Sequence, residues 1–98
     1  MKYESKPFAV PASNASGAAM DVSDHTSKWV QVYGTFTADL QLEGRVSAAA
    51  DWKAIGNVVN APGFIQVSQE LAQLRFTVSN FANGVPKAEL GARNARTD

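Results

Sequence analysis

The sequence predicts an all-β fold, an antiparallel β-sandwich with jelly-roll-like character and an extended N-terminal arm. Apolar and polar residues alternate along several short segments, and Gly, Pro, Asn and Asp separate these segments. No segment has the spacing of apolar residues that a long helix requires. We therefore expect residues 1–20 to form the arm and residues 21–98 to form one sandwich domain.

The arm is predicted from a soft composition. Two prolines bracket residues 8–10, and Ala, Ser, Asn and Gly dominate up to residue 19. Because Pro removes backbone donors and Ser, Asn and Gly favour loops, this part is expected to lie outside the sheets, and its deletion is expected to leave a folded domain. It is either a flexible terminus or an arm that docks on a neighbouring subunit or partner by strand addition. The candidate contacts of a docking arm are its apolar anchors, Phe8, Val10 and Met20.

The strongest pattern lies between Trp29 and Ala48, where apolar and polar residues alternate almost without interruption. Side chains on a strand point to opposite faces in turn, so the pattern predicts two strands that each bury one face. We interpret them as a hairpin with a loop at residues 37–39, in which Phe36 lies opposite Leu40 and Val30 opposite Val46. The polar face of this hairpin would then pair Tyr33 with Glu43 and Gln31 with Arg45.

Shorter elements follow this hairpin. In order, they are a segment at 52–60, a turn at 61–63, a strand at 64–67, a turn or helical bend at 68–72, a strand at 73–79, a loop at 80–84, and a last strand at 85–93. Trp52, at the start of the first segment, is expected to be buried in the core. Pro86 indicates that the last strand begins at a sheet edge. The predicted core consists of Val30, Val32, Phe36, Leu40, Leu42, Val46, Leu74, Phe76, Val78 and Leu90.

Composition excludes several classes of partner. Nine Lys and Arg balance nine Asp and Glu among 98 residues, so no overall field attracts nucleic acid or an anionic membrane. The absence of cysteine excludes disulfides, thiolate catalysis and Cys-based zinc sites, and it fits an intracellular origin. No apolar run approaches the roughly 20 residues that span a bilayer, and the first residues do not resemble a signal peptide.

The sequence offers no convincing catalytic or metal site. His25 is the only histidine, and residues 21–26 contain the residue types of a hydrolytic triad or a metal site. We interpret this polar stretch as a solvated connector, because proximity in sequence does not define catalytic geometry. The carboxylates are scattered, and no phosphate-binding glycine motif precedes a helix. We therefore expect no enzyme activity, no cofactor or metal, and no small-molecule ligand.

Two aromatic residues are the best candidates for a functional surface. Trp29 and Tyr33 lie on the same side of their predicted strand, opposite the apolar set. Three uses are open for such residues: contact with a subunit or partner, packing beneath the arm or a loop, and stacking on a ligand such as a sugar.

The chain resembles the small β-sandwich proteins of tailed-phage virions, especially head decoration or cement proteins. The resemblance covers about residues 28–93. It depends on an aromatic-led strand ending in Gly34-Thr35-Phe36, the strand at 40–47, the segment Trp52-Lys53-Ala54-Ile55-Gly56, the Pro62-Gly63 turn, and Leu74-Arg75-Phe76-Thr77-Val78 before Gly84.

The resemblance implies a non-enzymatic structural protein on the outside of a capsid, assembled in the host cytoplasm. Its partners would be the major capsid protein and further copies of itself, with a trimer as the expected oligomer. Two other functions share the fold and remain open: a carbohydrate- or receptor-binding module, and a component of the phage tail or neck.

Overall fold

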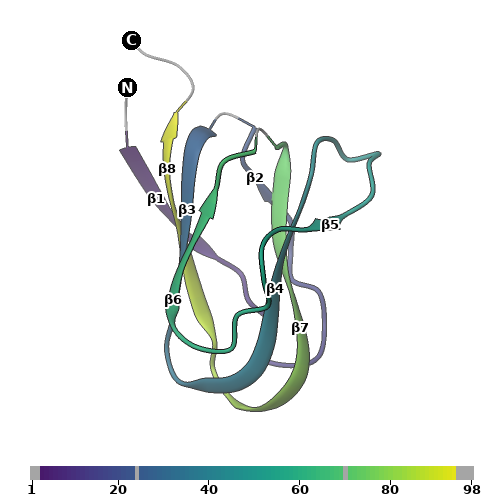
Figure 1. Ribbon diagram of the computed structural model, residues 1–98, viewed down its shortest axis with the longest axis vertical. Helices are drawn as coiled ribbons and strands as arrows, with labels where there is room; N and C mark the ends of the chain where they lie inside the picture. The colour runs from purple at the N-terminus through teal and green to yellow at the C-terminus, as the bar shows by residue number, and fades with distance from the viewer. Residues whose placement is uncertain (1–2, 24, 70, 95–98) are drawn as a thin grey trace.

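The protein is an antiparallel β-sandwich of two four-stranded sheets packed face to face, which confirms the predicted fold class (Figure 1). The computed structural model describes residues 3–23, 25–69 and 71–94. Sheet A has the strand order β1-β8-β3-β6 and sheet B the order β2-β7-β4-β5. The strands are β1 (Tyr3–Phe8), β2 (Met20–Asp21), β3 (His25–Tyr33), β4 (Phe36–Arg45), β5 (Lys53–Ala54), β6 (Gly63–Val67), β7 (Gln73–Gly84) and β8 (Lys87–Asn94). Among the described residues no helix is long and apolar enough to cross a membrane.

The strands pair in nested couples along the chain. β1 pairs with β8, β2 with β7, β3 with β6, and β4 with β5. Two further pairings, β3 with β8 and β4 with β7, join these couples into the two sheets. The chain therefore passes from one sheet to the other several times, and most of its pairings join residues that are distant in sequence.

The core lies between the sheets and contains most of the residues predicted for it. Eight of the ten predicted core residues are buried, namely Val30, Val32, Leu40, Leu42, Leu74, Phe76, Val78 and Leu90, and Phe36 is partly buried against them. The prediction is wrong for Val46, whose side chain is 66% exposed. β4 ends at Arg45, so Val46 no longer follows the alternation that buries Leu40 and Leu42.

The predicted hairpin at 29–48 is wrong, because its two strands belong to different sheets. β3 pairs with β6 and β8, whereas β4 pairs with β5 and β7. The link between them turns at Gly34, which has a φ of 92° that glycine adopts at little cost. Alternation requires only that each strand bury one face, and two strands in opposing sheets satisfy this as well as a hairpin does.

The N-terminal residues differ most from expectation, because they are built into both sheets rather than forming an arm outside them. β1 pairs with β8 along Tyr3–Phe8, and the backbone around Ser16 pairs with Thr77 of β7. Phe8 is 4% exposed and meets the ring of Phe76 edge to face, with centroids 5.0 Å apart. Its burial provides the apolar contact that keeps a proline-containing strand at the sheet edge.

The C-terminal strands are longer and more central than predicted. β7 continues through residues 80–84, where a loop was expected, and its end pairs with the start of β4. Pro86 precedes β8, and β8 is an inner strand flanked by β1 and β3, so the predicted edge position is wrong. Proline is tolerated there because it lies before the first residue that the sheet requires as a donor. The segment 52–60 contributes only β5 and one isolated pairing of Val59 with Leu40.

Candidate binding face

The outer face of sheet A carries two exposed aromatic side chains and a shallow hollow, and it is the candidate binding face. Two rows of side chains cross its four strands. The first row contains Ser5, Gly91, Trp29 and Gln66, and the second contains Pro7, Glu89, Gln31 and Phe64, each in the order β1, β8, β3, β6. The inward-facing residues of the same strands include the core residues Phe8, Val30, Val32, Val67, Ala88, Leu90 and Ala92, so this face lies over a buried layer.

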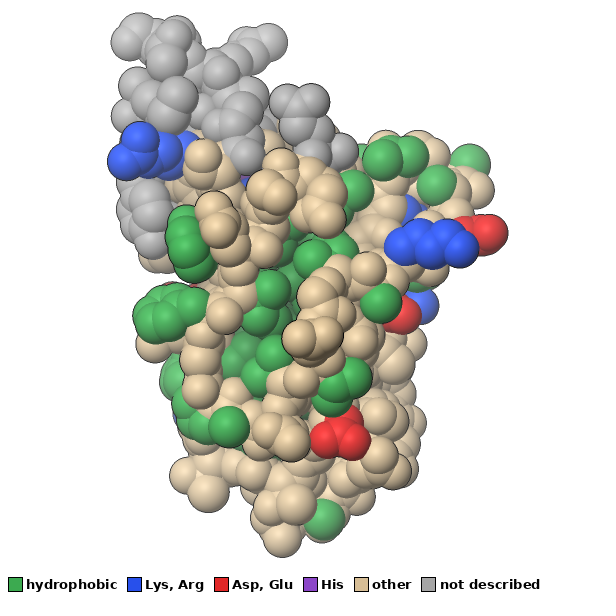
Figure 2. All heavy atoms as spheres, in the orientation of Figure 1, with side chains coloured by type: hydrophobic (Ala, Val, Ile, Leu, Met, Phe, Trp, Pro, Cys, Tyr) green, Lys and Arg blue, Asp and Glu red, His purple; other side chains and the backbone are tan. Residues whose placement is uncertain are grey.

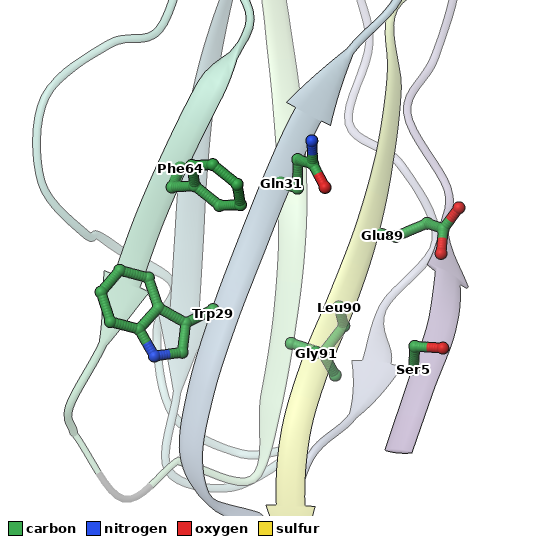
Figure 3. A pocket seen from close by; sticks show the side chains of 7 residues that line it. All are labelled: Ser5, Trp29, Gln31, Phe64, Glu89, Leu90 and Gly91. Atoms are coloured by element: carbon green, nitrogen blue, oxygen red, sulfur yellow. The ribbon is translucent and has the colours of Figure 1, made fainter. Parts of the chain in front are cut away.

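Trp29 and Phe64 are the exposed aromatic residues of this face. Trp29 is 47% exposed and Phe64 68% exposed, on neighbouring strands in adjacent rows. Figure 3 shows their rings on the same side of the sheet, with Gln31 beside them. Two large aromatic side chains that are this exposed and this close together make an apolar patch with a polar surround.

A shallow hollow of about 100 Å³ lies within this face (Figure 3). Its lining residues are Ser5, Trp29, Gln31, Phe64, Glu89, Leu90 and Gly91. Gly91 has no side chain and is the register partner of both Ser5 and Trp29, so it leaves space between them. The hollow thus combines an aromatic wall with one amide, one carboxylate and one hydroxyl group.

The Tyr33 hydroxyl group holds the Glu89 carboxylate at the border of the hollow. It donates a hydrogen bond to Oε2 of Glu89 at 3.1 Å. This hydrogen bond, together with desolvation and the charge of Glu89, raises the pKa of Tyr33. The prediction that Trp29 and Tyr33 share an outward face is therefore confirmed, although Tyr33 is half-buried and bonds to Glu89 rather than facing Glu43.

On the outer face of sheet B, by contrast, Glu43, Arg45 and Arg75 contact neighbouring side chains of the same face. Arg75 Nε lies 2.8 Å from Glu43 Oε1, and the Thr77 hydroxyl group donates to the same oxygen at 2.6 Å. The Arg45 and Arg75 guanidinium groups lie over the Trp52 ring, 4.2 and 4.4 Å from its centroid. The expected burial of Trp52 in the core is wrong: the ring is half-buried on this face, where the two cations cover it.

Glu43 is the electrostatic centre of the sheet B face. Partial burial by itself raises the pKa of Glu43, but hydrogen bonds from Thr77 and Arg75 and the positive charge of Arg75 outweigh it. The resulting pKa lies below the ordinary value. The charged groups of this face therefore stabilise the fold more than they attract a charged partner.

His25 is buried in β3 rather than lying in a solvated connector. Its backbone oxygen accepts a hydrogen bond from Lys28 Nζ at 3.3 Å, and Lys28 is itself fully buried. Asp24, part of the same polar stretch, lies outside the described residues. Asp21 accepts a hydrogen bond from the Ser23 backbone at 2.9 Å, which lowers its pKa and forms a local turn.

No group of three or more His, Cys, Asp or Glu that could hold a metal occurs in the described part of the chain.

The three apolar residues proposed as contacts of a docking arm lie against the chain's own core. Phe8 is in the core, and Val10 and Met20 pack against it, so these side chains are engaged within the chain. Of the five candidate contact residues, Trp29 and Tyr33 therefore remain on an outward face.

Sequence reasoning missed Phe64, Glu89, Ser5 and Gly91 as members of the face. The signal for Phe64 was its phase: Ile65 and Val67 point inward in β6, so Phe64 and Gln66 must point outward. Ser5, Glu89 and Gly91 join Trp29 only because β8 lies between β1 and β3. That strand order cannot be read from alternation.

Comparisons with protein-family models, with curated proteins and with solved structures found no match to this chain. Its function is therefore argued from the chemistry and geometry of the outer face of sheet A.

Proposed function

We propose that the protein is a non-enzymatic structural component of a virion that attaches to the outside of a capsid, with the outer face of sheet A as its protein-binding surface. The observation that carries this proposal is the exposure of Trp29 and Phe64 on neighbouring strands of one sheet face. Aromatic residues with a polar surround are enriched at the centres of protein interfaces, where a few of them supply most of the binding energy.

The arrangement of the strands supports the same proposal. The nested order 1-8-3-6 and 2-7-4-5 supports the jelly-roll interpretation of the sandwich, and eight-stranded jelly rolls occur in viral capsid and lectin domains. A capsid presents many equivalent sites, so an oligomer of this protein that contacts several of them at once would gain avidity from a modest affinity per contact. On sheet B the Glu43 carboxylate is already paired with Arg75, whereas Trp29 and Phe64 on sheet A are exposed aromatic side chains.

Co-sedimentation with capsids from the chain's own source tests the proposal. The capsids should lack the protein beforehand, and the bound copies should be counted at saturation. We expect Trp29→Ala and Phe64→Ala each to weaken binding by at least about tenfold, the loss typical of a buried interface anchor. Val46→Ala is the matched control, because Val46 is about as exposed as Phe64 but follows β4 in sheet B, away from this face. If the wild-type protein did not bind capsids, or if both aromatic variants bound normally, the proposal would be wrong.

A second candidate function is favoured by the hollow over Gly91. The aromatic wall of Trp29 and Phe64 suits the apolar face of a sugar ring, and Gln31, Glu89 and Ser5 offer partners for its hydroxyl groups. This geometry supports a carbohydrate-binding module as the alternative to a capsid-binding protein.

A glycan array followed by Trp fluorescence titration separates the two functions. A carbohydrate-binding module should show a shift that disappears in Trp29→Phe and weakens in Glu89→Gln, while Trp52 remains as the unaffected second indole. A capsid-binding protein should show no shift with any glycan. Soluble glycans should then also fail to displace it from capsids.

A further inference from the structure

The edges of the two sheets differ in how well they are protected against pairing with another chain. A sandwich of this strand order has four edge strands, which are β1 and β6 in sheet A and β2 and β5 in sheet B. An edge strand presents unpaired backbone donors and acceptors, which another strand can use. Natural proteins usually protect such edges with short strands, charged residues, prolines or bulges.

Three of the four edges carry such protection. β1 contains Lys6 and Pro7, a charged residue and a residue without a backbone donor. β2 and β5 are two residues long, and β5 contains the exposed Lys53. None of these edges offers a long, neutral row of backbone groups.

β6 is the exception. Gly63–Val67 forms five residues without a charge or a proline, and its register with β3 is continuous. In the described part of the chain β6 pairs with β3 alone, so its second edge has no strand beside it. The uncharged stretch is longer than the strand, because no charged residue occurs from Ala54 to Gln69. Phe64 exposes more than half of its side chain within it.

Apolar side chains are also visible from outside on this side of the molecule (Figure 2). Figure 2 shows hydrophobic side chains in the furrow between β6 and the segment that follows β5. Val59 and Ile65 are partly buried against the core here, and Val58 is 52% exposed. A strand added to the edge of β6 would cover this furrow while satisfying the backbone of β6.

We propose that β6 pairs edge to edge with β6 of a second copy of this chain. The edge is neutral, and it offers nothing to a charged partner, whereas a second copy brings an equally neutral and apolar stretch. In antiparallel pairing about a two-fold axis, the same surface of both copies forms the contact, which is called isologous. The apolar furrow of one copy would then lie beside the apolar furrow of the other. The two A sheets would join into one eight-stranded sheet.

This inference does not depend on capsid binding, and it differs from the trimer that the phage resemblance implies. An edge-to-edge contact about a two-fold axis closes at two copies. It would also place the Trp29 and Phe64 patches of both copies on one continuous outer surface. A capsid-attached protein or a carbohydrate-binding protein could use such a doubled face equally well.

The oligomeric state of the full chain is the first test, measured by light scattering and sedimentation equilibrium over a wide range of concentrations. With the two-fold axis at Ile65, the middle residue of β6, the side chains at position 66 of the two copies are diagonal neighbours on the same face of the joined sheet. We therefore expect a dimer whose dissociation constant rises at least tenfold in Gln66→Lys, since the two ammonium groups would repel each other there. Ser5→Lys is the matched control, because Ser5 is exposed on the opposite edge of the same sheet and should leave the dimer unchanged. A protein that stays monomeric throughout, or an oligomer that Gln66→Lys leaves intact, would overturn the inference.

Spin labels give a second test that does not require a destabilising charge. The chain has no cysteine, so Gln66→Cys and Ser5→Cys each provide a unique attachment site. With a strand spacing of about 4.8 Å, labels at position 66 should lie within about 25 Å of each other, and labels at position 5 beyond about 30 Å. A short distance at position 5, or none at position 66, would contradict pairing through β6.

Discussion

At the scale of single residues, the two outer faces differ in whether their side chains already have partners within the chain. On sheet B, Glu43 receives hydrogen bonds from Arg75 and Thr77, and the two guanidinium groups cover Trp52. On sheet A, Trp29 and Phe64 are exposed. Polar groups that already have partners within the chain gain little from binding, whereas exposed aromatic rings gain by leaving water.

Glu43 should make stability depend on pH. Its pKa is lower in the folded protein than in the unfolded chain, so its contribution is complete above the unfolded value near 4.5 and is lost as the pH falls through the folded value. At pH 7, Glu43→Gln should lower the free energy of unfolding by about 1 kcal/mol, because a partly exposed, charge-assisted pair is replaced by a neutral one.

Urea denaturation of both proteins from pH 7 to pH 3 measures this effect. The two curves of stability against pH should converge towards the acid end, where the wild-type carboxylate is protonated. Thr77→Val keeps the carboxylate but removes one of its hydrogen bonds, so it should fall between the other two proteins. Parallel curves over the whole range would show that Glu43 does not supply the pH dependence.

At the scale of the strands, alternation predicted which residues are buried but not which strands are neighbours. β3 and β4 bury Val30, Val32, Leu40 and Leu42 as expected, yet they lie in opposing sheets. The partner of a strand is decided by the links and by contacts distant in sequence, and no local pattern records these. The same reason explains why Trp29 and Tyr33 were found from the sequence, whereas Glu89 and Gly91 were not.

The N-terminal strand was misjudged because its composition is that of a loop. Pro7, the small residues and the absence of clear alternation all favour an extended segment outside the sheets. Phe8 reverses this preference, since its ring fills the core against Phe76, and Val10 and Met20 add contacts to the core. One large buried aromatic residue contributes more free energy than the local preferences of its neighbours.

The N-terminal strand should therefore be required for folding. Phe8→Ala should lower the free energy of unfolding by about 3–5 kcal/mol, the usual cost of removing a buried aromatic ring. Deleting residues 1–20 removes β1, the pairing of Ser16 with Thr77 of β7, and the first residue of β2. The truncated chain should therefore show no cooperative unfolding transition.

Denaturant titration followed by near-ultraviolet circular dichroism distinguishes these outcomes. Val46→Ala serves as the control, since truncating an exposed side chain should change stability by less than about 0.5 kcal/mol. A truncated chain that still unfolds cooperatively would support the original expectation of an arm outside the domain.

At the scale of the whole molecule, the nested strand order pairs the first strand with the last. Tyr3 and Arg93 are register partners in sheet A, although nearly the entire sequence lies between them, and Figure 1 shows β1 beside β8. Pairings of this kind must close long loops before they gain any contact energy. We therefore expect folding in the range of milliseconds to seconds, as in other all-β domains.

A circular permutant tests whether this loop closure limits the rate. Joining the end of β8 to the start of β1 by a short linker makes that pairing local, and the exposed turn at residues 47–50 is a suitable place for new ends. The permutant should keep the same core and fold faster than the wild-type chain, because the β1 and β8 pairing would no longer require the two ends to meet. Stopped-flow refolding monitored by Trp fluorescence measures both rates. If the permutant folded no faster, the slow step would be the pairing of β3 with β6 or of β4 with β5. The new connection does not shorten the length of chain between the two strands of either pair.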